Sequence, residues 1–156
     1  MNVLVVLFIS TGIAALVIKI MSREYHLPAG ARIGMSVMLL FTALGHFMFA
    51  RGMSMMVPDF IPFKIEMVYL TGIIEIAAAI GLQLPKLRVL TAWLLILFFV
   101  LILPSNVKAA MEHIDMYKAN YQGTGTGYLW FRIPLQLFFI AWIYFSTIKN
   151  HKRSSG

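Results

Sequence analysis

The sequence predicts an all-α integral membrane protein. Of its 156 residues, 60% are hydrophobic and only 12% are charged. Five long apolar runs follow one another along the chain, most of them close to the length of a helix that crosses a bilayer. A single soluble domain of this size does not bury so much apolar surface. We therefore expect one polytopic membrane domain over residues 1–150, followed by a solvated tail at 151–156 whose final Ser-Ser-Gly resembles an expression remnant.

The charge balance and the absence of cysteine narrow the function classes. The net charge of +7 comes from Lys and Arg residues that lie between the apolar runs, so it indicates membrane topology and not nucleic-acid binding. Without cysteine the chain forms no disulfide, does no thiol chemistry and supplies no cysteine ligand to an iron–sulfur cluster. We expect no intrinsic cofactor, and a redox role would need a borrowed one, such as a bound quinone.

The first apolar run, Asn2 to about Met21, has the length of one crossing. A signal peptide is the alternative, but the run has no basic segment before it and no small-residue cleavage pattern after it. A polar link with the helix-breaking Pro28-Ala-Gly30 leads to the second run, Ile33 to about Ala50. Residues 53–66 contain two prolines and are expected to lie on the membrane surface.

The third run, Met67 to Leu82, turns sharply into the fourth, so these two helices are expected to be antiparallel neighbours. The fourth run, Val89 to Leu103, is too short to cross unless its helix continues past Pro104 with a kink. Apolar residues at helical spacing beyond the proline predict an amphipathic continuation. They are Val107, Ala110, Met111, Ile114 and Tyr121.

A flexible linker is expected at 123–127, where the glycine spacing does not fit a phosphate-binding loop. The fifth run, Trp130 to Ile148, has Pro134 near its start, which suits the first turn of a helix. With the N-terminus outside, eight basic residues fall inside and five outside, which favours that orientation. Aromatic residues then mark the membrane interfaces, Tyr69, Tyr128 and Trp130 on the outer side and Tyr25 on the inner side.

Glu75 lies in the middle of the third run, where an ionised carboxylate is costly unless another group pairs with it. Under this topology several polar residues from other helices reach the same outer side, and they predict a pocket with Glu75 at its floor. We assign acid–base roles to Glu75 and His46. The candidate ligand-binding residues are Arg132, Asn106, Gln136, Thr71 and Tyr69.

Each of these residues also has a purely structural interpretation. Glu75 as a neutral acid can bond a backbone carbonyl, and His46 can cap its helix. Arg132 can be a snorkelling anchor, Asn106 can satisfy carbonyls freed by Pro104, and Gln136 can join two helices. The remaining histidines lie on the other side of the membrane or in an interfacial segment, so no metal or haem site is expected.

Short segments of the sequence resemble the DoxX family of small membrane proteins. They are Gly45-His46-Phe47, Met56-Val-Pro58, Ile61-Pro62, Val68-Tyr-Leu-Thr-Gly72-Ile-Ile-Glu75, Leu103-Pro-Ser-Asn106 and Arg132-Ile-Pro134-Leu-Gln136. The resemblance runs over 33–148 and implies a four-helix transmembrane bundle, to which the helix at 2–21 is an addition. Ser105 and Ile133 depart from the residues common in the family.

The resemblance implies a multi-pass protein of the bacterial cytoplasmic (inner) membrane. The family takes its name from a membrane subunit associated with thiosulfate:quinone oxidoreductase, and relatives are linked to redox homeostasis. More distant members resemble cargo receptors and receptor-assembly chaperones. The expected partners are the lipid bilayer, a lipophilic small molecule and a redox or client protein, and no nucleic acid.

Three functions compete on this sequence. The first is a redox-accessory subunit whose outer-side pocket binds a quinone or similar lipophilic molecule, with any turnover depending on a partner subunit. The second is a non-catalytic assembly factor whose polar face pairs with a client protein. The third is a small transporter, against which stands the lack of an inverted repeat and of paired interrupted helices.

Overall fold

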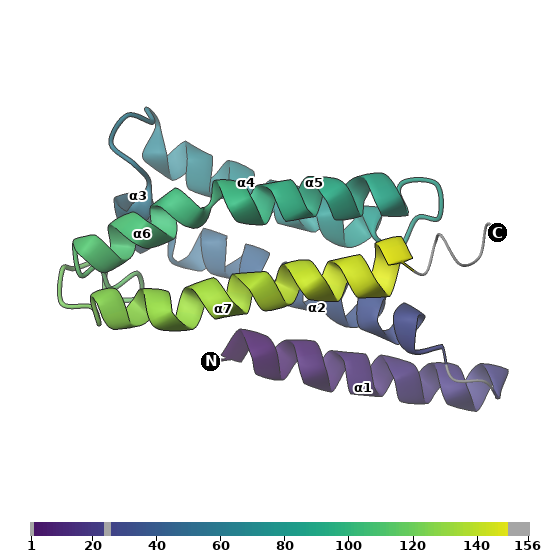
Figure 1. Cartoon of the computed structure of the whole chain (residues 1–156). Helices are drawn as coiled ribbons and strands as arrows, with labels where there is room; N and C mark the ends of the chain where they lie inside the picture. Colours follow the sequence, from purple (N-terminus) through teal and green to yellow (C-terminus); the bar gives the residue numbers. More distant parts are fainter. Residues whose placement is uncertain (1, 24–25, 150–156) are drawn as a thin grey trace.

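The computed structural model describes residues 2–23 and 26–149, and these form a bundle of helices lying roughly side by side (Figure 1). Two predictions, the inner interfacial position of Tyr25 and the solvated tail at 151–156, fall on residues outside the described ones. The helices are α1 (Asn2–Ser22), α2 (Leu27–Met48), α3 (Ala50–Met56), α4 (Lys64–Gly81), α5 (Arg88–Leu101), α6 (Leu103–Met111), α7 (Thr126–Ile143) and the π-helix η1 (Tyr144–Lys149).

The four helices long and apolar enough to cross a membrane, among the residues described, are Val3–Ser22, Leu27–Met48, Arg88–Met111 and Thr126–Lys149. The fourth of these joins α7 to η1, and the third joins α5 to α6. α4 is not among them, and its 18 residues include the charged Lys64, Glu66 and Glu75. At 1.5 Å per residue, α4 is about 27 Å long, which is close to the thickness of a bilayer core.

α1 lies along the outside of the bundle and packs mainly against α2 (Figure 1). The two helices approach closely at Gly34, where an added Cβ would lie 1.9 Å from Thr11 Oγ1. The ring of Phe8 also contacts α7, with its centroid 5.9 Å from that of Phe138 and 5.8 Å from that of Trp142. The N-terminal helix is therefore packed on the other helices and does not stand apart from them.

The core is apolar and lies between α2, α4, α5 and α7. Its largest cluster of buried side chains includes Met35, Met38, Leu39, Leu82, Leu95, Phe99, Leu135, Phe139 and Ile143. One buried polar contact joins α2 to α4, where the Ser36 hydroxyl donates to the Ala79 carbonyl at 2.8 Å. Many large apolar side chains remain exposed on the outer faces of the helices, as expected where the surrounding solvent is lipid.

The predicted start of the second helix is wrong. α2 begins at Leu27, six residues before the predicted Ile33, and includes the segment that was expected to break the helix. Pro28 lies in the first turn, where backbone N–H groups have no acceptor within the helix, so the proline costs no helical hydrogen bond. The proline therefore starts this helix.

The predicted kink at Pro104 is confirmed. α5 ends at Leu101 and α6 begins at Leu103, with Pro104 in its first turn. Because proline has no N–H, the carbonyl of Val100 receives no helical hydrogen bond from position 104. Together α5 and α6 cover 24 residues, which is enough for a crossing.

The predicted helical continuation to Tyr121 is wrong, because α6 ends at Met111. Beyond Met111, hydrogen bonds between side chains and the backbone compete with the hydrogen bonds of a helix. The Asp115 carboxylate accepts hydrogen bonds from the backbone N–H groups of Tyr117 and Lys118. Asp115 and Asn120 also form an isolated bridge. The apolar residues after Met111 therefore lie in a loop, although their spacing is that of a helix. Ile114 is buried in this loop.

The expected position of Pro134 in a first turn is also wrong. α7 begins at Thr126, inside the segment predicted to be a linker, and Pro134 lies within the helix. The carbonyl of Trp130 therefore lacks its usual donor four residues later. The linker before α7 is shorter than predicted and ends at Gly125, whose φ of 64° suits glycine.

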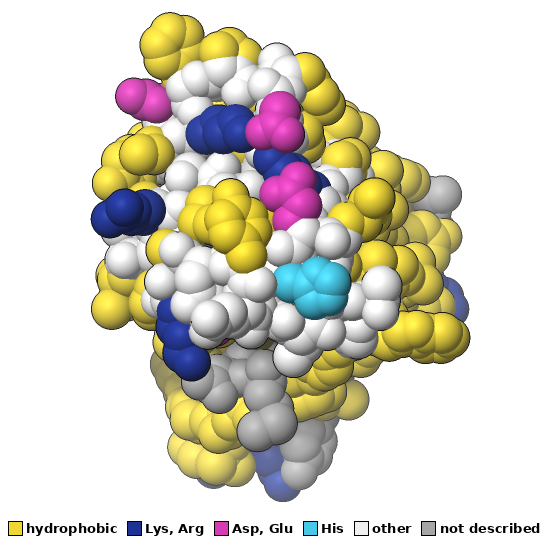
Figure 2. Space-filling model, turned by 90° about the vertical axis from the view of Figure 1, so that its left-hand side faces the viewer, with side chains coloured by type: hydrophobic (Ala, Val, Ile, Leu, Met, Phe, Trp, Pro, Cys, Tyr) yellow, Lys and Arg dark blue, Asp and Glu magenta, His cyan; other side chains and the backbone are white. Residues whose placement is uncertain are grey.

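The loop between α3 and α4 is held to α6 by a cluster of charges at one end of the bundle. Asp59 accepts a hydrogen bond from Lys108 at 2.7 Å and another from Lys64, and Lys108 also donates to the Val57 carbonyl. Acidic and basic side chains lie beside one another on this face (Figure 2). Lys108 Nζ is also 3.9 Å from Glu112.

This cluster predicts an acid-dependent loss of stability. The hydrogen bonds from Lys108 and Lys64 lower the pKa of Asp59 from 3.8 to about 2. Because the folded-state pKa is the lower one, the contribution of Asp59 is present above pH 3.8 and is lost as the pH falls toward 2. The thermal midpoint of the wild type should exceed that of Asp59→Asn above this window, and the difference should close within it. A difference that does not change with pH would contradict the assignment.

Candidate functional site

The candidate site lies where four helices meet at one end of the bundle. His46 is in the last turn of α2, and Glu75 lies well inside α4. Asn106 is in α6 just after the kink, and Arg132 is in the second turn of α7. The kink at Pro104 places the start of α6 within hydrogen-bonding distance of α7, since Asn106 contacts residues of that helix directly.

Glu75 and His46 form a buried pair between α4 and α2. Nδ1 of His46 lies 3.3 Å from Glu75 Oε2 and 3.0 Å from the carbonyl oxygen of Thr42. A carbonyl only accepts hydrogen bonds, so the contact with Thr42 requires a proton on Nδ1. That proton is directed mainly at Thr42, and Glu75 Oε2 is left without a well-aligned donor. In a neutral imidazole, Nε2 is then the nitrogen that can accept a proton.

Close approach of the two helices makes this pair possible. Gly72 lies almost one turn before Glu75 on α4, and an added Cβ there would lie 3.1 Å from His46 Cβ and 3.2 Å from a ring carbon of Phe47. A side chain at position 72 would require His46 or Phe47 to shift by a few tenths of an ångström. The glycine therefore allows the close approach of α4 to α2 beside the pair.

Asn106, Arg132 and Tyr128 form the second group of the site. Asn106 Oδ1 accepts hydrogen bonds from the Tyr128 hydroxyl at 3.3 Å and from the Arg132 guanidinium at 3.4 Å. The guanidinium also lies over the Tyr128 ring, 5.6 Å from its centroid. Asn106 is 2% exposed, so these contacts are made in the interior of the bundle.

Three buried polar atoms of the site have no hydrogen-bond partner within the described part of the chain. They are Glu75 Oε2, Asn106 Nδ2 and Arg132 Nε. Two are donors and one is an acceptor, so the site can both donate hydrogen bonds to an added group and accept one from it.

The other predicted site residues have different contacts. Gln136 is buried and donates to the carbonyl of Phe99 at 3.2 Å, near the break between α5 and α6. This contact joins α7 to α5, which is the structural role considered for Gln136 from the sequence. The Thr71 hydroxyl donates to the Val68 carbonyl of its own helix. Tyr69 stacks on Phe47, with ring centroids 5.7 Å apart, and is 40% exposed.

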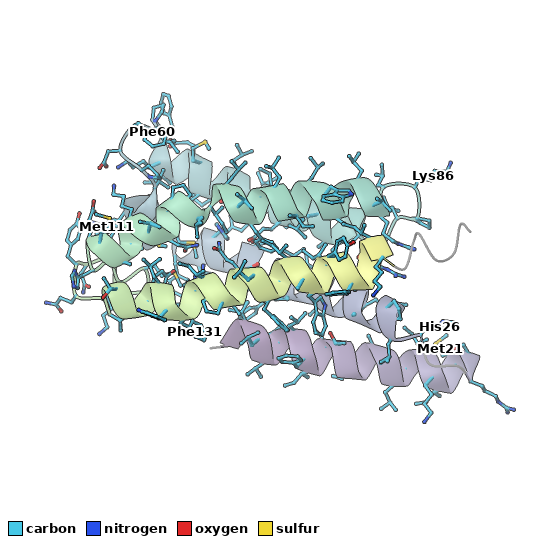
Figure 3. All side chains as sticks on the ribbon, viewed as in Figure 1. Met21, His26, Phe60, Lys86, Met111 and Phe131 are labelled. Atoms are coloured by element: carbon cyan, nitrogen blue, oxygen red, sulfur yellow. The ribbon has the colours of Figure 1, made fainter. Side chains whose placement is uncertain are left out.

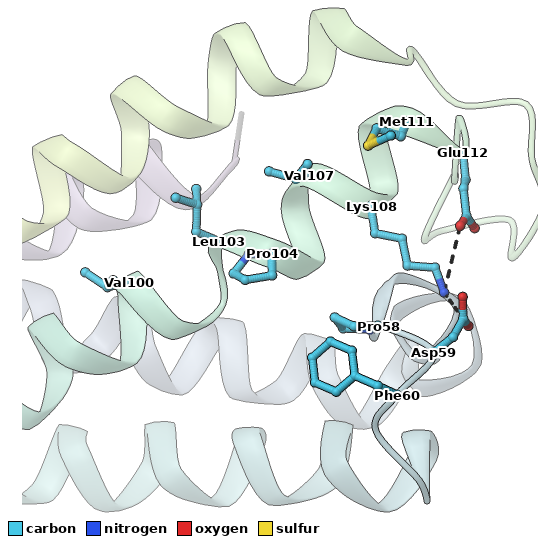
Figure 4. Close-up of a pocket in the computed structure, with 10 residues that line it drawn as sticks. All are labelled: Pro58, Asp59, Phe60, Val100, Leu103, Pro104, Val107, Lys108, Met111 and Glu112. Atoms are coloured by element: carbon cyan, nitrogen blue, oxygen red, sulfur yellow. Dashed lines mark hydrogen bonds and ion pairs between the residues drawn. The ribbon is translucent and has the colours of Figure 1, made fainter.

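Two cavities of the structure lie outside this group. The larger, of about 730 Å³, runs along the outer side of α5 and α6 beneath the loop at 58–60, with Lys108 and Asp59 at one end (Figure 4). The smaller, of about 270 Å³, lies between α1 and α7. Neither is lined by Glu75, His46 or Asn106. The Glu75 side chain is 6% exposed and that of His46 18%.

Sequence reasoning assigned Tyr128 only to the membrane interface and did not place it in the site. Its spacing of four residues from Arg132 was the available signal, since that spacing puts the two side chains on one face of a helix. The carbonyl of Thr42 was also missed, and no feature of the sequence marks a backbone acceptor of this kind. No group of three or more His, Asp or Glu residues able to hold a metal ion occurs in residues 2–23 and 26–149.

Comparison with known proteins places the chain in a family without assigning a reaction. Neither the curated proteins nor the solved structures give a match. A family model matches residues 35–147, which contain His46, Glu75, Asn106 and Arg132 and leave out α1. The chain therefore belongs to the family described as a domain of unknown function, DUF8561.

Proposed function

We propose that the protein is a multi-pass protein of the bacterial cytoplasmic membrane with a DoxX-like four-helix bundle. The bundle consists of α2, α4, α5 with α6, and α7 with η1, and α1 is an additional crossing. The order and spacing of the residues quoted above support this proposal, as does the start of the family match after α1. The N-terminus is outside and the C-terminus cytoplasmic, which puts the Glu75 site toward the outer side.

The site itself supports binding of a quinone or a similar lipophilic molecule with a polar head. The observation that carries this proposal is the set of unpartnered buried atoms, which consists of the donors Asn106 Nδ2 and Arg132 Nε and the acceptor Glu75 Oε2. A quinone carbonyl accepts hydrogen bonds, and the hydroxyl of the corresponding quinol donates them. Both forms can therefore be held by the same three side chains.

Glu75 and His46 are suited to proton exchange with such a molecule. Reduction of a quinone to a quinol takes up two electrons and two protons, and a carboxylate beside an imidazole can pass a proton to or from a ligand oxygen. The electrons would be exchanged with a partner subunit. We propose that the protein acts as a redox-accessory subunit on this basis.

The test is a titration of detergent-purified full chain with a short-chain ubiquinone analogue, followed by thermal unfolding. The thermal midpoint of the wild type should rise with quinone concentration. Glu75→Gln should lose this rise, whereas Glu66→Gln, an exposed glutamate on the same helix, should keep it. If the wild type shows no rise, or if both variants respond as the wild type does, the proposal is wrong.

An assembly factor is the second candidate, and burial of Glu75 makes it the weaker one. A carboxylate that pairs with a client helix has to face that helix, but the Glu75 side chain is 6% exposed and contacts α2. The distinguishing observation is a protein that co-purifies with the wild type and is lost in Glu75→Ala. Such a protein, in the absence of any quinone response, would favour this candidate.

A further inference from the structure

Within the described ranges, the end of the bundle opposite the Glu75 site carries basic side chains and no carboxylate. Six basic side chains lie at the end of α1, the start of α2, the turn between α4 and α5, and the end of η1. They are Lys19, Arg23, Arg32, Lys86, Arg88 and Lys149. The carboxylates within residues 2–23 and 26–149 lie in α4 or in the loops of the other end. Lys86 and His26 mark the basic end, and Phe60 and Met111 mark the other (Figure 3).

Three elements meet around Arg32 at this end. Its guanidinium donates to the Ser146 carbonyl of η1 at 3.3 Å, and its own carbonyl accepts a hydrogen bond from Gln83 at 3.2 Å. Gln83 also donates to the Ser36 hydroxyl and so fixes the start of the α4–α5 turn on α2. Arg88 is the first residue of α5, at the other end of that turn.

The turn that leads to Arg88 is held on α2 at Arg32 itself, because Gln83 in that turn donates to the Arg32 carbonyl. The side chains of Arg32 and Arg88 are both partly buried, and the Nε atom of each is enclosed without a hydrogen-bond partner in the part of the chain that the structure describes. None of the ion pairs among those residues involves either guanidinium. Two partly buried positive charges that no carboxylate among the described residues pairs with are unfavourable, and an added anion would offset these charges and satisfy the unmet donors.

We propose that Arg32 and Arg88 form a binding site for a phosphate group between α2, the α4–α5 turn and η1. A guanidinium presents several N–H donors in one plane, and two of them can hold the oxygens of one phosphate. The site lies at the ends of membrane-spanning helices, where the headgroups of anionic phospholipids are found. The phosphate is carried by such a lipid or is free in solution.

This inference does not depend on the proposed quinone function. The α4–α5 turn and the end of η1 lie at one end of the bundle, and α6 and the start of α7 lie at the other (Figure 1). The two sites share none of the residues that define them. Failure of one test therefore leaves the other proposal unaffected.

The experiment measures thermal unfolding of the detergent-purified full chain during three titrations. The probes are short-chain phosphatidylglycerol, short-chain phosphatidylcholine and inorganic phosphate. Phosphatidylglycerol should raise the midpoint more than phosphatidylcholine does. Arg88→Gln should weaken the apparent affinity for phosphatidylglycerol on the order of tenfold, through loss of charge-assisted hydrogen bonds. Arg88→Lys, which keeps the charge and loses the planar fork, should weaken it less.

Lys86→Gln is the matched control, because it removes one positive charge from an exposed position in the same turn. It should respond as the wild type does. A rise with inorganic phosphate equal to that with phosphatidylglycerol would identify free phosphate as the occupant of the same site. The proposal is overturned if neither phosphate-bearing anion stabilises the wild type more than phosphatidylcholine does, or if Lys86→Gln loses as much affinity as Arg88→Gln.

Discussion

Replacing Gly52 with alanine is expected to destabilise the protein by about 3 kcal/mol, near the upper end of the usual cost of overpacking. An added Cβ at this position would lie 1.8 Å from the carbonyl oxygen of Met116, so the helix α3 and the loop after α6 would have to separate. The obstacle is backbone and not the end of a flexible side chain, which makes local relief difficult. Equilibrium unfolding in detergent, with a denaturing detergent as the perturbant, measures the change.

Gly12→Ala is the control for this substitution. Gly12 lies in α1, and an added Cβ there meets no atom within 4 Å. Alanine is also the better helix former, so this variant should be as stable as the wild type or slightly more stable. Equal stability of the Gly52→Ala and Gly12→Ala variants would show that the loop after α6 does not pack on α3 as described.

Replacing Asn106 with leucine is expected to destabilise the protein by about 2 kcal/mol, because it leaves two partly buried donors without an acceptor. Asn106 Oδ1 is the acceptor for the Tyr128 hydroxyl and the Arg132 guanidinium. Leucine has a similar size, so the loss should come from hydrogen bonding rather than from a cavity. The same unfolding measurement gives the change.

Asn106→Asp separates the two explanations. Aspartate keeps an oxygen acceptor for Tyr128 and adds a charge opposite Arg132, so it should recover most of the stability that leucine loses. If aspartate and leucine destabilise the protein equally, position 106 tolerates only an asparagine for reasons of shape. The hydrogen-bonded group described here would then not be the source of its stability.

The sequence predicted most helix positions because apolar runs of bilayer length leave few alternatives. The prediction failed where the same type of residue favours different backbone structures at different positions. Pro28 starts a helix although it was expected to interrupt one, and Pro134 is accommodated inside α7. The apolar spacing around Ile114 matched a helix, but hydrogen bonds from the Asp115 side chain favour a loop. The spacing of apolar residues gives no information about these side-chain hydrogen bonds.

The candidate site was partly predictable for a related reason. A carboxylate in an apolar run requires partners, and the topology limited the choice to helix ends on one side, which led to His46 as the partner of Glu75. Sequence reasoning could not tell which side chains would bond to one another across helices. Asn106 bonds to Tyr128 and Arg132, whereas Gln136 bonds to the Phe99 carbonyl near the kink. Those pairings depend on the rotation of each helix about its axis.

The most direct test of the central claim is to locate a bound quinone on the chain. A photoreactive quinone analogue, irradiated with the purified protein and followed by peptide mass spectrometry, reports which residues lie beside the ligand head. We expect labelling of peptides that contain His46, Glu75 or Arg132, and loss of that labelling in Glu75→Gln. Labelling confined to the cavity lined by Phe60, Leu103 and Val107, unchanged in that variant, would contradict it.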